Sequence, residues 1–538
     1  MDPKHPNTAD LNAIELSLFV SRLEAVCDEM GAVLRNAALS PNIRDRLDFS
    51  CAVFDAEGAL CAQAAHIPVH LGSMAFAMAD LVGGFAWDEG DMAIVNDPYL
   101  GGTHLPDVTI IAPVFVAGGL VAFVVNRAHH ADIGAGTPGS MPISRTLTDE
   151  GVVIEPRHLL RRDRLDQDAL AEVTGSTRNP NQARGDFFAQ ISANRTGRAR
   201  VAELISGVGI SAFHRGLVAM NDYAERLARA ALREIGDGTY RFTDLMDDDG
   251  QGNRDIPISV TLRVQDGQID CDFIGTGSQV DGNINCPLAV AAAAVFYCFR
   301  CLMPPQTPAC AGSLRPIHLH APLGSLVNAQ RPAAVAAGNV ETSTRIVDAV
   351  LGALAQALPD RIPAASHGSM NNLAIGGYRA QDNGGDAWDY YETIGGGMGA
   401  GAHGGGLSGV QTHMTNTLNT PIEVLESRFP LRVVRYGLRR GSGGPGARAG
   451  GDGLVREFEC LAPFQATLIG ERRLHAPWGL AGGADGTPGG EWVNGRPLPG
   501  KVTLELSVGD RLRIETPGGG GWGVADAPEQ QPEQQSED

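Results

Sequence analysis

The 538-residue chain is poor in positive charge and in cysteine. Its formal net charge is −20, Lys4 and Lys501 are its only lysines, and no basic run occurs in it. Phosphate backbones bind clustered cations, so this balance argues against a nucleic-acid surface. The nine cysteines are odd in number and irregularly spaced, which excludes a disulfide framework.

Targeting and membrane signals are also missing from the sequence. The first ten residues contain no apolar stretch after a basic region, so no secretory signal is visible. The apolar segment 108–125 is long enough to resemble a membrane helix, but Pro113 and the Gly118–Gly119 pair interrupt it. We therefore expect a soluble, cytoplasmic protein without membrane contact.

No nucleotide-binding motif is present, although the chain is rich in glycine. The pattern GxxxxGK[ST] does not occur, and no GxGxxG follows a strand with an acidic residue at the right distance downstream. The glycine-rich segments between residues 333 and 419 are therefore interpreted as long functional loops without a nucleotide site.

The chain length and the distribution of helical and strand patterns along the sequence predict a multidomain α+β protein. A chain of this length exceeds what one hydrophobic core can organise, and its 43% hydrophobic and 19% charged content is ordinary for a globular protein. Helical spacing dominates 11–39, 159–177 and 180–237, whereas alternating and turn-rich patterns dominate from 236 onward. The predicted division is a tail (1–12), an α/β domain with the metal site (13–235), a middle α+β domain with a β-meander and Gly-rich loops (236–425), a β-rich domain (426–524) and a disordered tail (525–538).

The segment from Asn96 to Asp132 carries the chemistry. Two apolar runs rich in Val, Ile and Phe flank the reversal at 117–119, which predicts an antiparallel hairpin. Pairing about Gly118 joins residues whose numbers sum to about 236, an estimate from turn placement. On that register Asp107 lies opposite His129.

His104 lies three residues before Asp107 and can reach the same spot from the incoming loop. Two imidazoles and a carboxylate would then converge at the open end of the hairpin, with room left for water or substrate. Each residue alone has a structural explanation, because loop histidines are usually solvated and an Asp after Pro often caps a turn. Their convergence on one register favours a divalent metal site for Mn, Zn or Fe.

Several further polar residues are candidates for the substrate pocket. His66 and His70 lie four apart, and Pro68 between them favours an extended segment, so they are either a structural pair or a pocket pair. Arg195 is either a cationic partner of the site or a salt-bridging helix residue. The substrate-binding candidates are His66, His70, Arg195, Glu341, His413 and Asn416. His130 should point away from His129 on an extended strand.

Nine motifs in order carry a resemblance to a known family. They are SPNIRDRLDFSCAVFD, HIPVHLGSM, NDPYLGGTHLPDVT, NRAHHADIG, GNVETSTRI, THMTNTLNTPIE, FPLRVVRYGLR, GERR and TPGGGGWG. With these motifs the chain resembles the B-type subunits of ATP-dependent hydantoinases and 5-oxoprolinases, which include the α subunits of acetone-type carboxylases. The resemblance covers nearly the whole chain.

The resemblance implies a divided enzyme. A separate A-type subunit with an actin-like ATPase fold would bind ATP and Mg and phosphorylate the carbonyl oxygen of a small cyclic amide. The B-type chain would hold the metal, whose bound water opens the activated ring, in a heterotetramer or larger assembly. In the carboxylase branch manganese is held by residues matching His104, Asp107 and His129. Asp48 matches a further carboxylate of lactam-hydrolysing relatives and is either a fourth ligand or the general base.

Three functions remain open from the sequence. The first is the hydrolytic subunit of a hydantoinase, 5-oxoprolinase or lactamase, with Asp48, His104, Asp107 and His129 as catalytic residues. The second is the metal subunit of a ketone carboxylase, and the third is a scaffold for an ATPase partner. The three convergent ligands count against the scaffold, and the chain length favours the hydrolase.

Overall fold

The first unit of the fold is a seven-stranded antiparallel sheet. The computed structural model describes residues 11–64, 66–377 and 387–525. The strands follow the order β2-β1-β5-β4-β3-β6-β7. Their bounds are β1 Phe49–Asp55, β2 Leu60–Gln63, β3 Met92–Val95, β4 Asp107–Val116, β5 Gly119–His129, β6 Arg157–Arg161 and β7 Arg164–Leu165.

The predicted hairpin forms β4 and β5 at the centre of this sheet. Asp107 pairs with His129, as the estimated sum of 236 requires, and a bulge interrupts the register only between Val114 and Phe115. The turn residues are Ala117 and Gly118, with φ of 51° and 81°. Two consecutive positive φ values are typical of the tight turns that join twisted strands. The hairpin and its register are confirmed.

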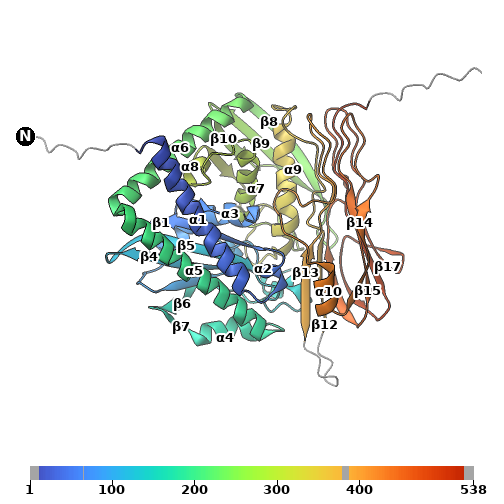
Figure 1. Cartoon of the computed structure of the whole chain (residues 1–538). Helices are drawn as coiled ribbons and strands as arrows, with labels where there is room; N and C mark the ends of the chain where they lie inside the picture. The colour runs from blue at the N-terminus through green and yellow to red at the C-terminus, as the bar shows by residue number, and fades with distance from the viewer. Residues whose placement is uncertain (1–10, 65, 378–386, 526–538) are drawn as a thin grey trace, which may run out of the picture.

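Helices cover both faces of the sheet. Figure 1 shows α1 and α5 side by side in front of it. The core on this side contains Leu23, Met30, Val124 and Phe187, and a smaller core lies between the opposite face and α3. The bounds are α1 Ala13–Ala37, α2 Pro41–Arg44, α3 Pro68–Gly83, α4 Gln167–Gly175, α5 Pro180–Val208 and α6 Ile210–Leu232, with short 3-10 helices at Pro98–Leu100, Pro138–Ser140, Leu147–Glu150 and Arg233–Ile235.

Two local predictions in this unit were wrong. The segment with His66 and His70 is not extended, because α3 starts at Pro68 and contains His70 in its first turn. Proline is well tolerated at the first helical position, where its missing N–H has no helical partner. Residues 159–165 belong to β6 and β7 instead of a helix, since Arg162 and Asp163 adopt positive φ and form a turn.

The middle unit is a four-stranded sheet covered by helices, and the predicted meander is confirmed in its first three strands. The sheet order is β11-β10-β9-β8, with β11 parallel to β10. Its core continues into α7 and α9. The bounds are β8 Gly238–Asp248, β9 Arg254–Gln265, β10 Gln268–Asp272, β11 Ile317–His320, α7 Leu288–Arg300, α8 Ala311–Leu314, a π-helix Gly338–Thr342 and α9 Ser343–Leu354.

Two sheets packed face to face form the last unit. One has the order β13-β12-β16-β19 and the other β14-β15-β20-β17-β18, with Leu373, Phe458 and Phe464 in the core between them. The predicted boundary at 425/426 runs through the first sheet. The bounds are β12 Asn372–Gly377, β13 Trp388–Thr393, α10 Ile422–Arg428, β14 Leu431–Arg439, β15 Gly453–Cys460, β16 Phe464–Ile469, β17 Gly490–Val493, β18 Arg496–Leu498, β19 Lys501–Leu506 and β20 Arg511–Glu515.

The glycine-rich segments pack against one another as extended chains instead of forming open loops. Gly397 donates to Pro517 O, Gly451 to Met398 O and Gly519 to Gly451 O, at 2.8 to 3.0 Å. A Cβ on Gly397 or Gly451 would lie 1.9 Å from a backbone oxygen. Only glycine allows this approach, so these glycines serve backbone packing.

The fold class is therefore α+β with several units, as predicted. No single helix among the described residues is long and apolar enough to cross a membrane; α5 together with Ile210–Ile235 meets that test only as a pair bent by 103°. The predicted tails fall mostly on residues 1–10 and 526–538, outside the described part of the chain.

Candidate metal centre

Three neighbouring strands bring acidic and imidazole groups to one edge of the first sheet. β1 and β4 both pair with β5, so the start of β1, the end of β5 and the start of β4 meet there. The backbone N–H of His129 donates to Asp48 O at 3.0 Å. This pairing places Asp48, His129 and Asp107 beside one another, although about 60 residues separate the outer two.

The loop before β4 adds the fourth group. Asp107 N donates to His104 O at 3.0 Å, and this turn folds His104 back onto the strand end. His104 Nε2 lies 3.2 Å from Asp107 Oδ1 and 3.3 Å from His129 Nδ1, and His129 Nδ1 lies 3.0 Å from Asp107 Oδ1. The predicted triad is thus one compact, buried cluster.

This cluster fits a divalent cation. Ligands about 2.1 Å from a common tetrahedral or octahedral centre lie roughly 3 Å from one another, which matches the three separations. His129 faces the other two ligands through Nδ1. His104 Nδ1 faces Ala336 O at 3.3 Å, which leaves Nε2 as the ligating nitrogen. His104, Asp107 and His129 can therefore hold a metal ion.

The protonation pattern of the cluster supports this fit. Burial opposes charge on His104, but Asp107 outweighs it and raises the pKa of His104. Burial also opposes charge on Asp107, whereas His104 and His70 hold its pKa well below the usual range. Burial lowers the pKa of His129, which is therefore neutral at neutral pH. Asp107 therefore keeps its negative charge, as a carboxylate ligand of a metal ion must.

Asp48 and His70 flank the cluster without joining it. His70 Nε2 lies 3.1 Å from Asp107 Oδ2 and 3.9 Å from Asp48 Oδ1. Asp48 Oδ2 lies 3.9 Å from the buried guanidinium of Arg46. The three-residue group whose ligand atoms lie within 4.8 Å of one another does not include Asp48.

The third unit of the fold closes the site from the other side. The Tyr391 ring on β13 stacks on His129, with centroids 4.8 Å apart and planes 14° from parallel. Tyr391 OH donates to Asn372 Oδ1 at 2.7 Å, and Asn372 Nδ2 donates to Glu341 Oε1 at 2.6 Å. Glu341 therefore lies behind Tyr391, two hydrogen bonds removed from the stacked ring.

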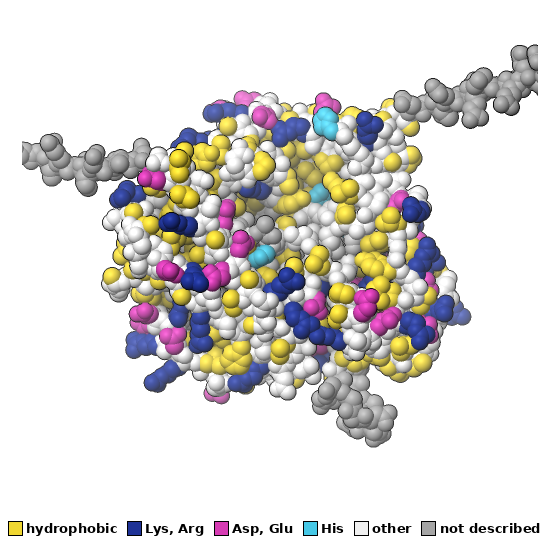
Figure 2. Space-filling view, viewed as in Figure 1, with side chains coloured by type: hydrophobic (Ala, Val, Ile, Leu, Met, Phe, Trp, Pro, Cys, Tyr) yellow, Lys and Arg dark blue, Asp and Glu magenta, His cyan; other side chains and the backbone are white. Residues whose placement is uncertain are grey.

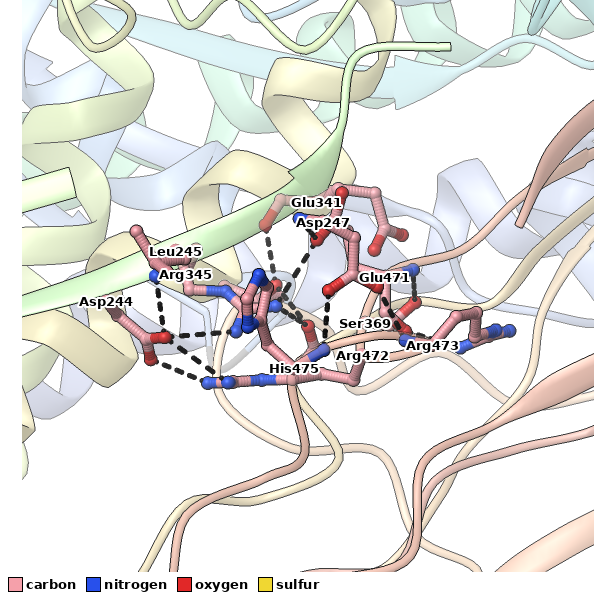
Figure 3. Close-up of polar contacts among 12 residues, drawn as sticks. Asp244, Leu245, Asp247, Glu341, Arg345, Ser369, Glu471, Arg472, Arg473 and His475 are labelled. Atoms are coloured by element: carbon pink, nitrogen blue, oxygen red, sulfur yellow. Dashed lines mark hydrogen bonds and ion pairs between the residues drawn. The ribbon is translucent and has the colours of Figure 1, made fainter. Parts of the chain in front are cut away.

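Glu341 also borders a buried network of charges, which Figure 3 draws with Glu471 and three arginines. Lys501 Nζ lies 2.6 Å from Glu471 Oε1, and Arg472 pairs with Asp244 at 2.7 Å. Burial and the charge of Glu471 raise the pKa of Glu341 to about 8. The acids and bases of this network pair internally and join the middle and last units.

The remaining predicted pocket residues fall in two places. His66 and Asn416 line a cavity of about 260 Å³ between α3, α7 and α8, and His413 contacts its wall through Tyr297 OH at 3.3 Å. Arg195 is exposed on α5 and lines a different surface pocket together with Asp88 and Arg162. The structure therefore does not bring Arg195 to the metal cluster.

His130 lies on the far side of its strand, as predicted. Its ring stacks on Phe187 with centroids 4.3 Å apart, and Nε2 lies 2.9 Å from Gln190 Oε1.

Several residues at the site were not predicted. Thr103 Oγ1 donates to Asp107 Oδ2 at 2.5 Å, and Asn339 Nδ2 lies 3.5 Å from the same oxygen. Arg46 reaches Tyr391 O at 3.0 Å and holds β13 against the cluster. Thr103 and Arg46 are within two residues of predicted ligands, so proximity could have indicated them. Asn339 lies in the GNVETSTRI motif, two residues from Glu341, so that motif could have indicated it, whereas Tyr391 comes from a distant segment without such a signal.

A family model for hydantoinase B/oxoprolinase matches residues 12–525 of this chain. The chain is 39% identical to an uncharacterized protein of Methanocaldococcus jannaschii, over 95% of this chain and 91% of that protein. It is 38% identical to 5-oxoprolinase 1 of Arabidopsis thaliana, over 96% of this chain but only 42% of that protein. The chain thus spans less than half the length of this longer relative.

Two solved structures share the fold. An ATP-dependent caprolactamase from Pseudomonas jessenii superposes with a TM-score of 0.87 at 27% identity, covering 96% of this chain and 92% of that one. An acetone carboxylase in its nucleotide-free form superposes with a TM-score of 0.85 at 19% identity, covering 95% and 76%. The second likeness shows the common fold alone.

Proposed function

This chain belongs to the hydantoinase B/oxoprolinase family, and from that premise we propose that it is the metal-bearing, hydrolytic subunit of an ATP-dependent cyclic amide hydrolase. The observation that carries the proposal is the buried His104–Asp107–His129 cluster with Asp48 beside it. The ATP-dependent caprolactamase with the same fold supports a lactam or related ring as substrate.

The proposed reaction overcomes the low reactivity of an amide. Nitrogen donates into the carbonyl, which makes the ring carbon a poor electrophile. Transfer of the γ-phosphoryl group from ATP to the carbonyl oxygen leaves ADP and converts that oxygen into a leaving group. Water then adds to the ring carbon and the C–N bond breaks, with a proton passing to nitrogen, which leaves an acyl phosphate. A second water hydrolyses the acyl phosphate, so that phosphate leaves and an amino acid remains. A cation held by the triad would supply Lewis acidity and lower the pKa of water at the site.

The residues around the triad have distinct proposed tasks. Asp48 takes a proton from the attacking water, because its carboxylate is almost fully buried yet outside the ligand cluster. His70, 3.1 Å from Asp107 Oδ2, fixes the orientation of that ligand. Tyr391 holds the plane of the His129 ring by stacking.

The proposal requires a separate ATPase partner of the A type. The sequence has none of the phosphate-binding motifs considered above, and the chain matches only 42% of 5-oxoprolinase 1. The remaining length of that relative suits the ATP-dependent activation that the A-type ATPase would supply. ATP and Mg would then bind to the partner in a heteromeric assembly.

Acetone carboxylase shares the fold alone, so the second candidate function, carboxylation of a ketone, rests on the sequence resemblance to the acetone-type carboxylases. The two candidates differ in their co-substrate, since a carboxylase requires bicarbonate and a hydrolase requires only water.

Co-expression with an A-type ATPase chain tests the proposal. ATP consumption and ring-opened product would be measured with hydantoin, 5-oxoproline, simple lactams, and ketones with bicarbonate, with an Asp107→Asn complex as control. We expect product from a cyclic amide without bicarbonate and no ATP hydrolysis by this chain alone. ATPase activity of the isolated chain, or turnover only of ketones with bicarbonate, would contradict the proposal.

A further inference from the structure

The face of the first sheet that packs against α3 changes from charged to apolar in three rows. Every second residue of a strand points to the same face, so each row joins neighbours from β1, β5 and β4. The row at the metal centre consists of Asp48, His129 and Asp107. Two residues inward on each strand lies a polar row of Ser50, Arg127 and Thr109. The third row is part of the apolar core against α3 and consists of Ala52, Val125 and Ile111.

Arg127 lies at the centre of the polar row and is fully buried. On the face of the molecule that Figure 2 shows, Lys and Arg side chains lie at the surface and are mixed with acidic ones, which is their usual place. The three groups that accept hydrogen bonds from Arg127 are neutral oxygens. Burying a guanidinium costs free energy even when it is hydrogen-bonded, so these contacts indicate a specific task.

Two of the hydrogen bonds hold the ends of one short segment. Arg127 Nε donates to Thr109 Oγ1 at 2.8 Å, two residues after Asp107 on β4. Arg127 Nη2 donates to Gly101 O at 2.9 Å, three residues before His104. The segment between these two points carries both His104 and Asp107, and the same guanidinium fixes its two ends.

The third hydrogen bond reaches α3. Arg127 Nη1 donates to Ser73 Oγ at 2.6 Å. Ser73 Oγ donates in turn to the backbone oxygens of Val69 and His70, at 2.8 and 3.0 Å. His70 Nε2 lies 3.1 Å from Asp107 Oδ2. The first turn of α3 is thereby tied to the hairpin beside the carboxylate of Asp107.

We propose that Arg127 is a positioning residue of the metal centre. Its three hydrogen bonds hold the loop with His104, the start of β4 and the first turn of α3 in fixed relative positions. Each bond uses a different nitrogen of the planar guanidinium, whereas a lysine has a single nitrogen on a flexible stem. The inference rests on the proposed function, because Arg127 has this task only if the triad binds a metal.

Mn²⁺ titration of Arg127→Met and Arg127→Lys tests the role in the purified full chain, without ATP or a partner. Arg127→Met removes all three hydrogen bonds, and we expect Mn²⁺ to bind about 10- to 100-fold more weakly, as after loss of an outer partner of a metal ligand. Arg127→Lys keeps the charge but cannot reach all three acceptors, so its affinity should also stay about tenfold below wild type. Wild-type affinity in either variant would overturn the proposal.

Co²⁺ bound in place of Mn²⁺ provides a spectroscopic measurement of the same effect. Its visible absorption depends on the number and arrangement of its ligands. At saturating Co²⁺, we expect the bands of both Arg127 variants to differ from those of wild type in position or intensity. Identical spectra in all three proteins would contradict a positioning role.

Ser73→Ala and Thr109→Val each remove one acceptor and are milder changes than those at Arg127. Each should weaken Mn²⁺ binding less than Arg127→Met does. Combined with Arg127→Met, each should add less than its own separate effect, because residues that act through one contact are not additive. Fully additive losses of affinity in both double variants would show that Arg127 does not act through these residues and would overturn the proposal.

Arg472→Met is the matched control for the loss of a buried arginine. Arg472 is also almost fully buried, but it pairs with Asp244 and Asp348 in the charge network of Figure 3. We expect this variant to have a lower melting temperature and wild-type Mn²⁺ affinity. A loss of affinity equal to that of Arg127→Met would reduce the effect to general destabilisation and overturn the proposal.

Failure of this inference is distinguishable from failure of the proposed function. Tight Mn²⁺ binding by wild type and by both Arg127 variants would overturn the positioning role alone. No Mn²⁺ binding by wild type would contradict the metal centre, and the role of Arg127 with it.

Discussion

Asp107 and His129 are directly paired across the β4–β5 hairpin, and their side chains meet at 3.0 Å between Oδ1 and Nδ1. A one-residue slip of this register would turn one of the two side chains to the opposite face of the sheet. The buried apolar residues of both strands fix the register, so the core of the sheet also sets the geometry of the candidate metal centre.

Replacing His104, Asp107 or His129 with Ala removes one of three ligands. We expect metal affinity to fall at least about 100-fold, since even the loss of an outer partner of a metal ligand costs 10- to 100-fold. Elemental analysis of the purified variants measures this. Arg195→Gln, on the exposed face of α5, should retain wild-type metal content, and equal metal content in all four variants would show that the site is misplaced.

Asp48→Asn separates the two roles open to this residue. The carboxylate lies outside the three-residue cluster, so we expect metal content to stay near wild type while turnover falls about 10²- to 10⁴-fold, the usual contribution of a general base. Parallel metal analysis and steady-state kinetics of the partnered enzyme check this. Metal loss as severe as in Asp107→Ala would instead identify Asp48 as a ligand.

Tyr391 is expected to act by orienting His129. Tyr391→Phe keeps the stacked ring but loses the hydrogen bond to Asn372, whereas Tyr391→Leu loses both. We expect Leu to weaken metal binding about tenfold and Phe to have a smaller effect. Metal titration of both variants measures the difference, and equal affinities for Leu and wild type would rule out an orienting role.

Glu341 should make stability depend on pH. Its folded pKa of about 8 exceeds its ordinary value of 4.5 because of burial and the nearby charge of Glu471. Protonated Glu341 therefore stabilises the folded state. This contribution to stability is complete below about pH 4.5 and is lost as the pH rises through about 8.

Glu341→Gln cannot ionise and removes this dependence. When the pH is raised from about 5.5 to about 8.5, the difference in melting temperature between Glu341→Gln and wild type should shift in favour of the variant. Thermal melts at both pH values test this, with Glu423→Gln on exposed α10 as a control whose difference should stay constant. A variant whose melting temperature follows wild type at both pH values would contradict the raised pKa.

The predictable part of the site was the part made by neighbouring strands. Alternating strand faces and one tight turn determine which residues of a hairpin face each other, so Asp107 and His129 followed from spacing. His104 and Asp48 lie within a few residues of those strand ends. Tyr391 and Asn339 lie more than 200 residues away along the chain, and their positions depend on how separate units pack.

The wrong predictions also have physical causes. Pro68 was interpreted as a helix breaker, although at a first helical position it begins α3 and positions His70 against Asp107. The glycine-rich segments are largely irregular, as predicted, but local sequence did not show that they pack as extended chains in close backbone contact. Arg195 was one of many helix arginines, and only the fold shows that its side faces solvent.

Titration of Mn²⁺ into metal-free wild-type chain and into Asp107→Asn, followed by calorimetry, tests the central claim most directly. We expect one equivalent per chain in wild type, bound by His104, Asp107 and His129. The variant should lose that binding. The same stoichiometry and affinity in both proteins would contradict the metal centre and the function proposed from it.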